Sequence, residues 1–180
     1  MGVLAYFITF HTYGSWLHGR DKGSVDDEHS KPGLPLLPPN QERERWEENR
    51  LKHPPVELDA ERRFVVDQTI KEVCEHRQWP LHALNVRTTH VHAVVSSDHK
   101  PERVMNDFKA YCTRRMRETG VFPANRDAWS YHGSTRWIDT QESFTQAVDY
   151  VTNQQGAPLA RAEPSGWSTI ARKQNHEPRA

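Results

Sequence analysis

Hydrophobic and polar positions follow two periods along the chain, and each period predicts one kind of element. Aromatic and β-branched residues concentrate in four short stretches bounded by turn residues, which is typical of β-strands; the predicted strands are 3–12, 81–86, 91–96 and 134–138. Three longer stretches place apolar residues three and four positions apart, as on the buried side of a helix. These predicted helices start after Asp59, at Pro101 and after Asp139 or Thr140, and they end near Arg77, Glu118 and Gln155.

The order of these elements predicts the fold. Strand, helix, strand, strand, helix, strand, helix favours an α+β, ferredoxin-like (RRM/palm-like) sandwich. We expect a four-stranded antiparallel sheet with helices on one face, plus a C-terminal helix. The strands 81–86 and 91–96 are predicted to pair as a hairpin about the turn 87–89. A chain of 180 residues suffices for one domain with a proper core.

Two segments depart from this pattern. Residues 19–57 are rich in proline and carry only a short charged helical piece, 41–51, so we expect a long surface insertion that is either functional or disordered. Residues 159–180 are polar and predict a flexible tail. The predicted domain is therefore 1–158. The low apolar fraction of 35% fits a chain in which part of the sequence adds nothing to the core.

Composition narrows the classes of function. Lys plus Arg and Asp plus Glu both count 24, so any DNA-binding surface must come from local clustering. The two cysteines, Cys74 and Cys112, lie far from a Cys-x-x-Cys spacing, which argues against a zinc ribbon or a disulfide framework. No apolar stretch approaches the ~20 residues of a membrane span, and the apolar start lacks a basic leader. We therefore expect a cytoplasmic protein without membrane contact.

Two short segments carry the candidate chemistry. His90 and His92 fall on one face of a predicted strand, because strand side chains alternate, and two imidazoles there make half of a metal site. The plainer alternative is that they form the solvent side of the strand. Tyr150 and Gln154 lie one turn apart on the last helix, so a nucleophile and a third ligand share a face. Here the alternative is an aromatic side chain that flanks the core.

A second tyrosine competes for the role of nucleophile. Tyr111 lies in the helix after the hairpin, beside basic residues. Four positions after Tyr111 stands Arg115, which would repel a cation, whereas Gln154 follows Tyr150 at ligand spacing. Tyr150 is therefore preferred. The aromatic residues that could stack on unpaired bases, or pack in the core instead, are Trp16, Trp129, Tyr131 and Trp137.

Several motifs, in this order, resemble the single-tyrosine HUH transposases of small insertion sequences and the REP-associated tyrosine transposases. They are the opening Phe-Ile-Thr-Phe-His-Thr-Tyr-Gly-Ser-Trp, the Thr-His-Val-His strand, the Phe-Lys-Ala-Tyr-Cys-Thr-Arg-Arg helix, the Trp-Ile-Asp lead and Tyr-Val-Thr-Asn-Gln. The similarity covers most of residues 3–155. Two features depart from the family pattern: Thr89 stands where Asp or Asn is frequent, and the 19–57 insertion is long.

The resemblance implies a metal-dependent enzyme that nicks and rejoins single-stranded or hairpin DNA. Tyr150 would form a 5′-phosphotyrosine intermediate, and His90, His92 and Gln154 would bind Mg²⁺ or Mn²⁺. The alternatives are a domesticated, non-cleaving hairpin-DNA-binding protein and a replication-initiator or relaxase nickase. Relatives include both homodimers that exchange the tyrosine helix and monomers, so that question stays open. Candidate DNA contacts are Arg87, Lys109, Arg114, Arg115, Arg117 and Trp137.

Overall fold

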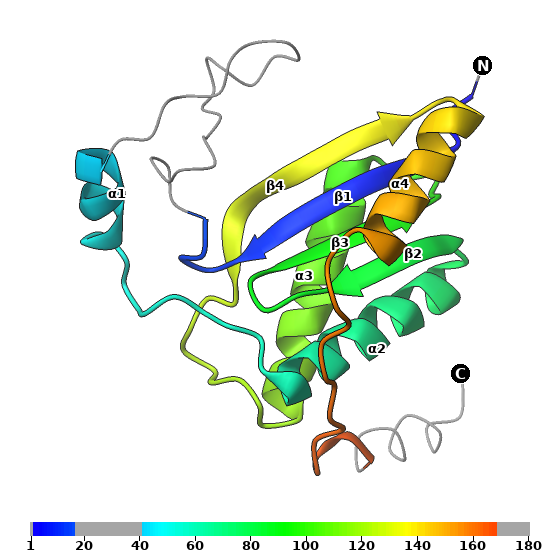
Figure 1. The fold of residues 1–180 in the computed structure, drawn as a ribbon. Helices are drawn as coiled ribbons and strands as arrows, with labels where there is room; N and C mark the ends of the chain where they lie inside the picture. The colour runs from blue at the N-terminus through cyan, green and yellow to red at the C-terminus, as the bar shows by residue number, and fades with distance from the viewer. Residues whose placement is uncertain (1, 17–40, 169–180) are drawn as a thin grey trace.

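The computed structural model describes residues 2–16 and 41–168 (Figure 1). Part of the predicted insertion, 19–40, and the end of the predicted tail, 169–180, lie outside the described residues. The described chain forms a four-stranded antiparallel sheet with helices packed on it, which confirms the predicted α+β sandwich. Among the helices described, none is long and apolar enough to cross a membrane.

The sheet has the strand order β2-β3-β1-β4, with every neighbouring pair antiparallel. The two strands of the predicted hairpin, β2 (Leu81–Val86) and β3 (His90–Val95), pair directly. The first strand, β1 (Ala5–Thr12), lies between β3 and β4 (Trp129–Ile138). Strand β4 begins at Trp129, five residues before the predicted start at residue 134. Most of its side chains are exposed, so the apolar alternation that marks a strand is absent from its first half.

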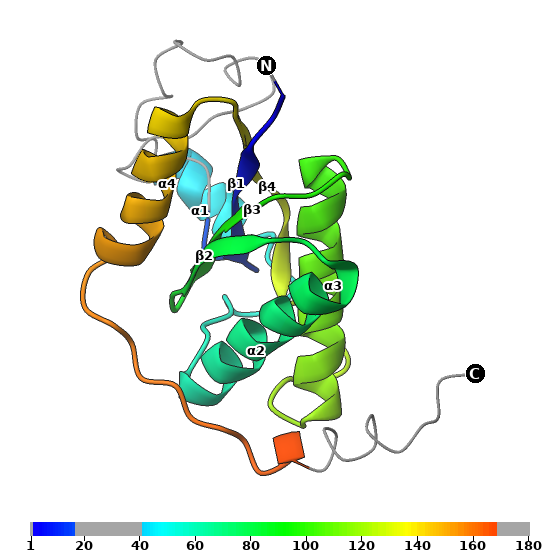
Figure 2. The same cartoon turned by 90° about the vertical axis from the view of Figure 1, so that its right-hand side faces the viewer.

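The two long helices pack on one face of the sheet (Figure 2). For α2 (Ala60–Arg77), the start is fixed by Asp59, whose side chain accepts a hydrogen bond from the Arg62 amide. For α3 (Pro101–Glu118), a proline opens the first turn, where its missing N–H costs nothing. Both helices have the predicted bounds, and their predicted apolar stripes are buried, with Val66, Ile70, Val73 and Cys74 on α2 and Val104, Met105, Phe108 and Cys112 on α3.

The last helix, α4 (Gln141–Asn153), lies on the opposite face of the sheet (Figure 2). The sheet therefore separates two hydrophobic clusters. A large one joins α2, α3 and the sheet, and a smaller one joins α4 to the other face through Ala5, Ala83, Val94, Ile138, Ala147 and Val151. The short charged helix α1 (Gln41–Glu48) lies apart from these layers (Figure 1).

The segment after α4 is held against the body of the protein over the residues described. The Arg87 Nη1 group donates to the Ala157 carbonyl at 2.9 Å, and the Arg63 Nε group donates to the Ala160 carbonyl at 3.1 Å. Arg161 forms an ion pair with the buried Asp67, and the Trp167 ring packs edge-on against Phe64. Residues 157–168, which we name the strap, therefore run along α2. Residues 160–168, part of the predicted tail, make these specific contacts, and the flexibility of the tail stays a prediction.

Candidate active site

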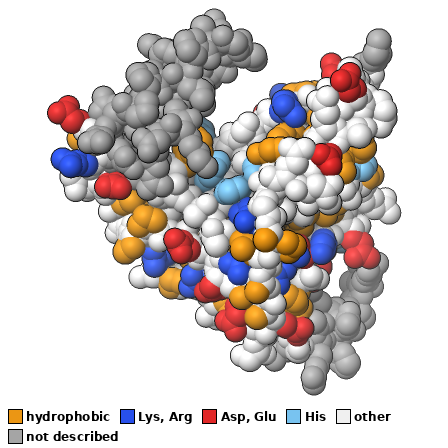
Figure 3. All heavy atoms as spheres, in the orientation of Figure 1, with side chains coloured by type: hydrophobic (Ala, Val, Ile, Leu, Met, Phe, Trp, Pro, Cys, Tyr) orange, Lys and Arg blue, Asp and Glu red, His pale blue; other side chains and the backbone are white. Residues whose placement is uncertain are grey.

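His90 and His92 project from β3 toward the face that carries α4. Their neighbours Val91, Ala93 and Val95 fill the large cluster on the other face, so strand alternation leaves the two imidazoles side by side. The ring centroids lie 4.8 Å apart, and His92 is only 7% exposed. In the space-filling view, histidine side chains appear on this face beside α4, with Lys or Arg side chains nearby (Figure 3).

Tyr150 stands beside this pair of histidines. Its ring centroid is 5.7 Å from that of His92 and 5.9 Å from that of Phe7, which lies on β1. The helix is fixed here because Val151 is buried in the smaller cluster, and the Asn85 Nδ2 group donates to the Val151 carbonyl at 3.0 Å. Tyr150 itself is 40% exposed, so its phenol is accessible from solvent.

The glutamine predicted as the third ligand faces elsewhere. Because α4 ends at Asn153, Gln154 is the C-cap residue with non-helical backbone angles, and its Nε2 group donates to Asp149 Oδ2 at 2.6 Å. The next residue, Gln155, is half-buried, and its side chain is hydrogen-bonded to His92 and donates to the Tyr150 carbonyl at 3.2 Å. The sequence analysis did not select Gln155, because the predicted helix continued to that residue, whereas α4 ends at Asn153.

Two residues of β1 complete the surroundings of the histidines. Thr9 lies opposite His92 in the register, and its Oγ1 atom is 2.8 Å from His92 Nδ1. His11 lies opposite His90, with the ring centroids 5.6 Å apart. The sequence does indicate that Phe7, Thr9 and His11 share one face of β1, because strand side chains alternate. It does not indicate that β1 pairs with β3, so neither Thr9 nor His11 could be assigned to the site.

Burial keeps the imidazoles of His11 and His92 neutral at neutral pH. Burial first, and then the nearby charges of His90 and His11, lower the pKa of His92 to about 4. The pKa of His11 is lowered to about 4 as well, first by burial and then by the charges of His90 and Lys109. A neutral imidazole has a lone pair available for a metal ion, whereas an imidazolium does not.

Positive charge reaches this face from two arginines. The Arg87 charge acts on His92, and the guanidinium of Arg136 lies over the Phe7 ring, 5.3 Å from its centroid. Arg87 is one of the residues predicted to contact DNA, whereas Arg136 was not predicted. Arg136 is thereby close to the histidines as well, because the Phe7 ring centroid is 5.6 Å from that of His92.

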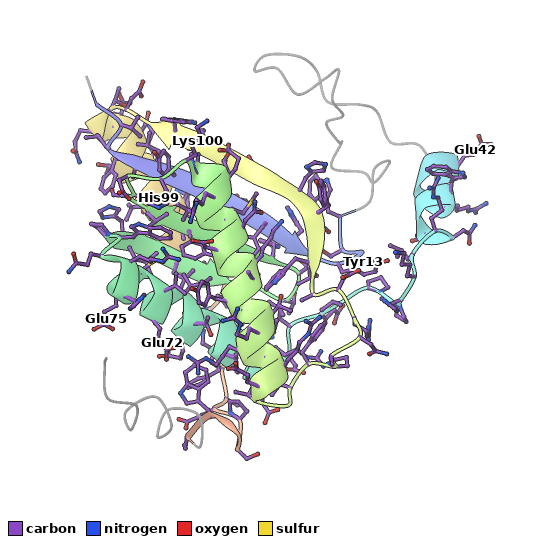
Figure 4. All side chains as sticks on the ribbon, turned by 180° about the vertical axis from the view of Figure 1, so that it is seen from behind. Tyr13, Glu42, Glu72, Glu75, His99 and Lys100 are labelled. Carbon is purple, nitrogen blue, oxygen red and sulfur yellow. The ribbon has the colours of Figure 1, made fainter. Side chains whose placement is uncertain are left out.

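The other residues predicted to contact DNA lie on the opposite side of the sheet. Lys109 donates from Nζ to the carbonyls of Ser130, Tyr131 and His132 at 2.9, 3.1 and 3.2 Å, so it ties α3 to β4. Arg115 forms a 2.8 Å ion pair with Glu72 of α2, which is labelled in the view from behind (Figure 4). The outer surface of α3 carries Arg114 and Arg117, and Trp137 packs edge-on against Tyr6.

Tyr111 also belongs to that far side. It projects from α3, which packs on the face away from α4, and the Arg114 guanidinium lies 5.5 Å from the centroid of its ring. The sheet therefore separates Tyr111 from the two histidines, whereas the Tyr150 ring contacts one of them. This geometry supports the preference for Tyr150.

Comparison with known proteins assigns the class. The model of the family described as "Transposase IS200 like" matches residues 53–154, which is more than half of the chain and includes both histidines and Tyr150. The chain belongs to the IS200-like transposase family, as the motifs predicted. This membership defines it as a transposase.

Solved structures give more distant likenesses. A REP-associated tyrosine transposase bound to a REP hairpin is 11% identical with a TM-score of 0.44, covering 84% of this chain and 67% of that one. A candidate transposase from Deinococcus radiodurans R1 is 15% identical with a TM-score of 0.42, covering 87% of this chain and 95% of that one. No curated protein matches the chain.

Proposed function

We propose that the protein cleaves and rejoins single-stranded or hairpin DNA with Tyr150 as the nucleophile. The observation that carries this proposal is the contact of the Tyr150 ring with His92, which places an accessible phenol beside two adjacent imidazoles. Membership of a transposase family makes DNA the expected substrate. No other tyrosine among the described residues makes a ring contact with either histidine.

The proposed reaction exchanges one phosphoester for another. The Tyr150 Oη atom loses its proton and attacks the phosphorus, so an Oη–P bond forms while the P–O3′ bond breaks. The leaving oxygen takes up a proton and becomes a free 3′-OH, and the downstream strand remains linked through its 5′-phosphate. Because the covalent link conserves the phosphoester, a 3′-OH attacking it can rejoin strands without ATP.

The residues present fit a divalent metal ion. His92 is neutral and its Nδ1 atom is engaged by Thr9, so the nitrogen left for a metal ion is Nε2, which would exchange its hydrogen bond with Gln155 for the ion. The described residues contain no group of three or more His, Cys, Asp or Glu side chains suited to a metal, and we infer that an amide oxygen supplies the third protein ligand. We assign that role to Gln154, which must first leave Asp149. Mg²⁺ or Mn²⁺ bound there would act as a Lewis acid on the phosphate.

A covalent-capture assay tests the function. Single-stranded oligonucleotides labelled at the 3′ end are incubated with the protein and Mn²⁺, because the proposed link retains the 3′ fragment. A labelled species that survives denaturation is expected with the wild type and with Tyr111→Phe, and it should be lost with Tyr150→Phe. Label at the 5′ end should instead appear in a free, shortened strand. An adduct that persists in Tyr150→Phe would refute the proposal.

A non-cleaving hairpin-binding protein is the second candidate. The observation that favours it is the orientation of Gln154 toward Asp149 instead of toward the histidines. This candidate predicts DNA binding that is unchanged when His90, His92 and Tyr150 are replaced, together with no adduct from the wild type. The same assay, run beside a binding measurement, separates the two functions.

A further inference from the structure

A row of aromatic rings crosses the face that carries the histidines. The ring centroid of Trp16 is 4.7 Å from that of His11, which is 5.6 Å from that of His90. From His90 the row continues to His92 and then to Tyr150, at 4.8 and 5.7 Å. Trp16 is 41% exposed, so part of its indole is available to a ligand.

Trp16 and Tyr150 lie at opposite ends of this row. The Tyr150 ring contacts Phe7, and the Trp16 ring contacts His11, four residues further along β1. At about 3.3 Å per residue, these positions on the strand are roughly 13 Å apart. In the register with β3, His92 lies opposite Thr9, midway between these two positions, and His90 lies opposite His11.

The geometry of phosphoryl transfer indicates on which side of Tyr150 the leaving nucleoside lies. The attacking and leaving oxygens lie roughly in line on opposite sides of the phosphorus. If Tyr150 attacks a phosphate at the histidines, the leaving 3′-oxygen points away from Tyr150, toward His11 and Trp16. The nucleoside that carries that oxygen must extend in the same direction.

We propose that Trp16 is a base-stacking subsite for the nucleotide immediately 5′ of the cleaved bond, the one released with a free 3′-OH. This assignment rests on the proposed function and names which part of the DNA that site holds. An indole face accepts any base, and a base–aromatic stack is worth about 5- to 150-fold in binding. Arg136 and Arg87 supply the positive charge for the adjoining backbone on the same face.

The other aromatic residues considered for base stacking do not compete for this position. The Trp129 ring packs against Phe10 in the large cluster, and its Nε1 group donates to the Lys109 carbonyl at 3.1 Å. Trp137 packs against Tyr6, which belongs to the same cluster on the far side of the sheet. Tyr131 lies against His132 on β4. Trp16 is the one of the four whose ring joins the histidine row.

The test combines a protein variant with a DNA modification. The bond cleaved in a random single-stranded pool is first mapped by sequencing the captured 3′ fragments and the released 5′ strands. Oligonucleotides are then made with an abasic residue immediately 5′ or immediately 3′ of that bond. In the wild type, the 5′ abasic residue should slow adduct formation about 5- to 150-fold. Trp16→Ala should slow the intact substrate similarly and lose most of the penalty of the 5′ abasic residue, while Trp16→Phe should restore part of the rate.

Controls separate this subsite from folding and from the function itself. Trp46→Ala removes an indole that is 58% exposed on α1 and should leave the rate unchanged. Far-UV circular dichroism checks that each variant is folded. Two results would overturn the subsite alone. One is an equal rate of adduct formation in Trp16→Ala and the wild type; the other is a 5′ abasic residue that slows Trp16→Ala as much as it slows the wild type. Absence of any adduct with the wild type would instead refute the proposed function, and the subsite with it.

Discussion

The hydroxyl of Thr9 lies 2.8 Å from Nδ1 of His92, across the pairing of β1 with β3. This contact holds the imidazole in one orientation and leaves Nε2 as its other nitrogen. Losing a group that orients a metal-binding histidine in this way typically lowers metal affinity about 10- to 100-fold. Thr9 thus connects the central strand of the sheet to the chemistry proposed for its neighbour.

Replacing Thr9 should weaken metal binding without damaging the fold. We expect Thr9→Val to lower Mn²⁺ affinity about 10- to 100-fold, because the isosteric side chain fills the same space but releases the imidazole. Thr9→Ser keeps the hydroxyl and should stay close to the wild type. Isothermal titration with Mn²⁺ measures both variants. Equal Mn²⁺ affinity in Thr9→Val and the wild type would contradict the orienting role.

Two glutamines at the end of α4 can be distinguished by the same titration. We expect Gln154→Ala to lower Mn²⁺ affinity, whereas Gln155→Ala should change it by less than about twofold. The exposed hydrogen bond between Gln154 and Asp149 costs little to break, so Asp149→Ala should not weaken binding. The reverse pattern, with only Gln155→Ala affected, would transfer the ligand role to the amide that is bonded to His92.

The buried histidines predict a loss of stability in mild acid. The pKa of His92 in the folded protein is about 4, below the value of 6.5 for the unfolded chain, so the unfolded state binds more protons between these values. Stability is therefore fully present above pH 6.5 and falls as the pH drops toward 4, by an amount on the order of 3 kcal/mol. Urea unfolding at several pH values measures this slope. His92→Gln should reduce the slope and leave the part that His11 contributes, and a slope unchanged in that variant would argue against His92 as a source.

Lys109 should prove to be structural. Lys109→Met removes three charge-assisted hydrogen bonds to β4 carbonyls, and we expect a loss of about 2 kcal/mol in the free energy of unfolding. The matched control is Arg114→Ala, an exposed change five residues further on α3, which should stay within about 0.5 kcal/mol. Denaturant titration compares the two. If Lys109→Met unfolds like the wild type, the hydrogen bonds to β4 contribute little.

The position of α4 on its own sheet predicts that each subunit carries a complete site. A mixture of Tyr150→Phe and His92→Ala should therefore form no covalent adduct, because neither chain supplies both groups. If subunits exchanged this helix, the mixture would regain part of the wild-type activity. Size-exclusion chromatography of the same mixture shows whether the two variants associate.

Much of the fold could be predicted because it rests on strongly periodic segments. The bounds of α2 and α3 follow from their apolar stripes together with Asp59 and Pro101. The first half of β4 gave no such signal, since an edge strand with exposed side chains needs no apolar alternation. Position 133 of β4 needs a glycine, because a Cβ atom there would collide with the Met105 sulfur and the Thr9 carbonyl oxygen. A glycine required by close packing resembles a turn residue in the sequence.

The candidate site could be predicted only in part, for a different reason. Alternation on one strand placed His90 and His92 together, but the side of the sheet on which each helix packs is a tertiary property. Basic residues on α3 therefore resembled a DNA-binding surface, although Lys109 and Arg115 bond within the fold. The contributions of His11 and Thr9 depended on the pairing of β1 with β3, which joins segments about 80 residues apart.

The unequal size of the two hydrophobic clusters has a consequence for motion. The small cluster and a few contacts, such as the hydrogen bond from Asn85 to the Val151 carbonyl, hold α4, whereas α2 and α3 share the large cluster. We therefore expect the opening of α4 to cost less free energy than global unfolding. Its amide hydrogens should accordingly exchange with solvent sooner than those of α2. Tyr150 would thus lie on a helix that opens more readily than α2, and the contacts of the strap would limit how far that helix moves.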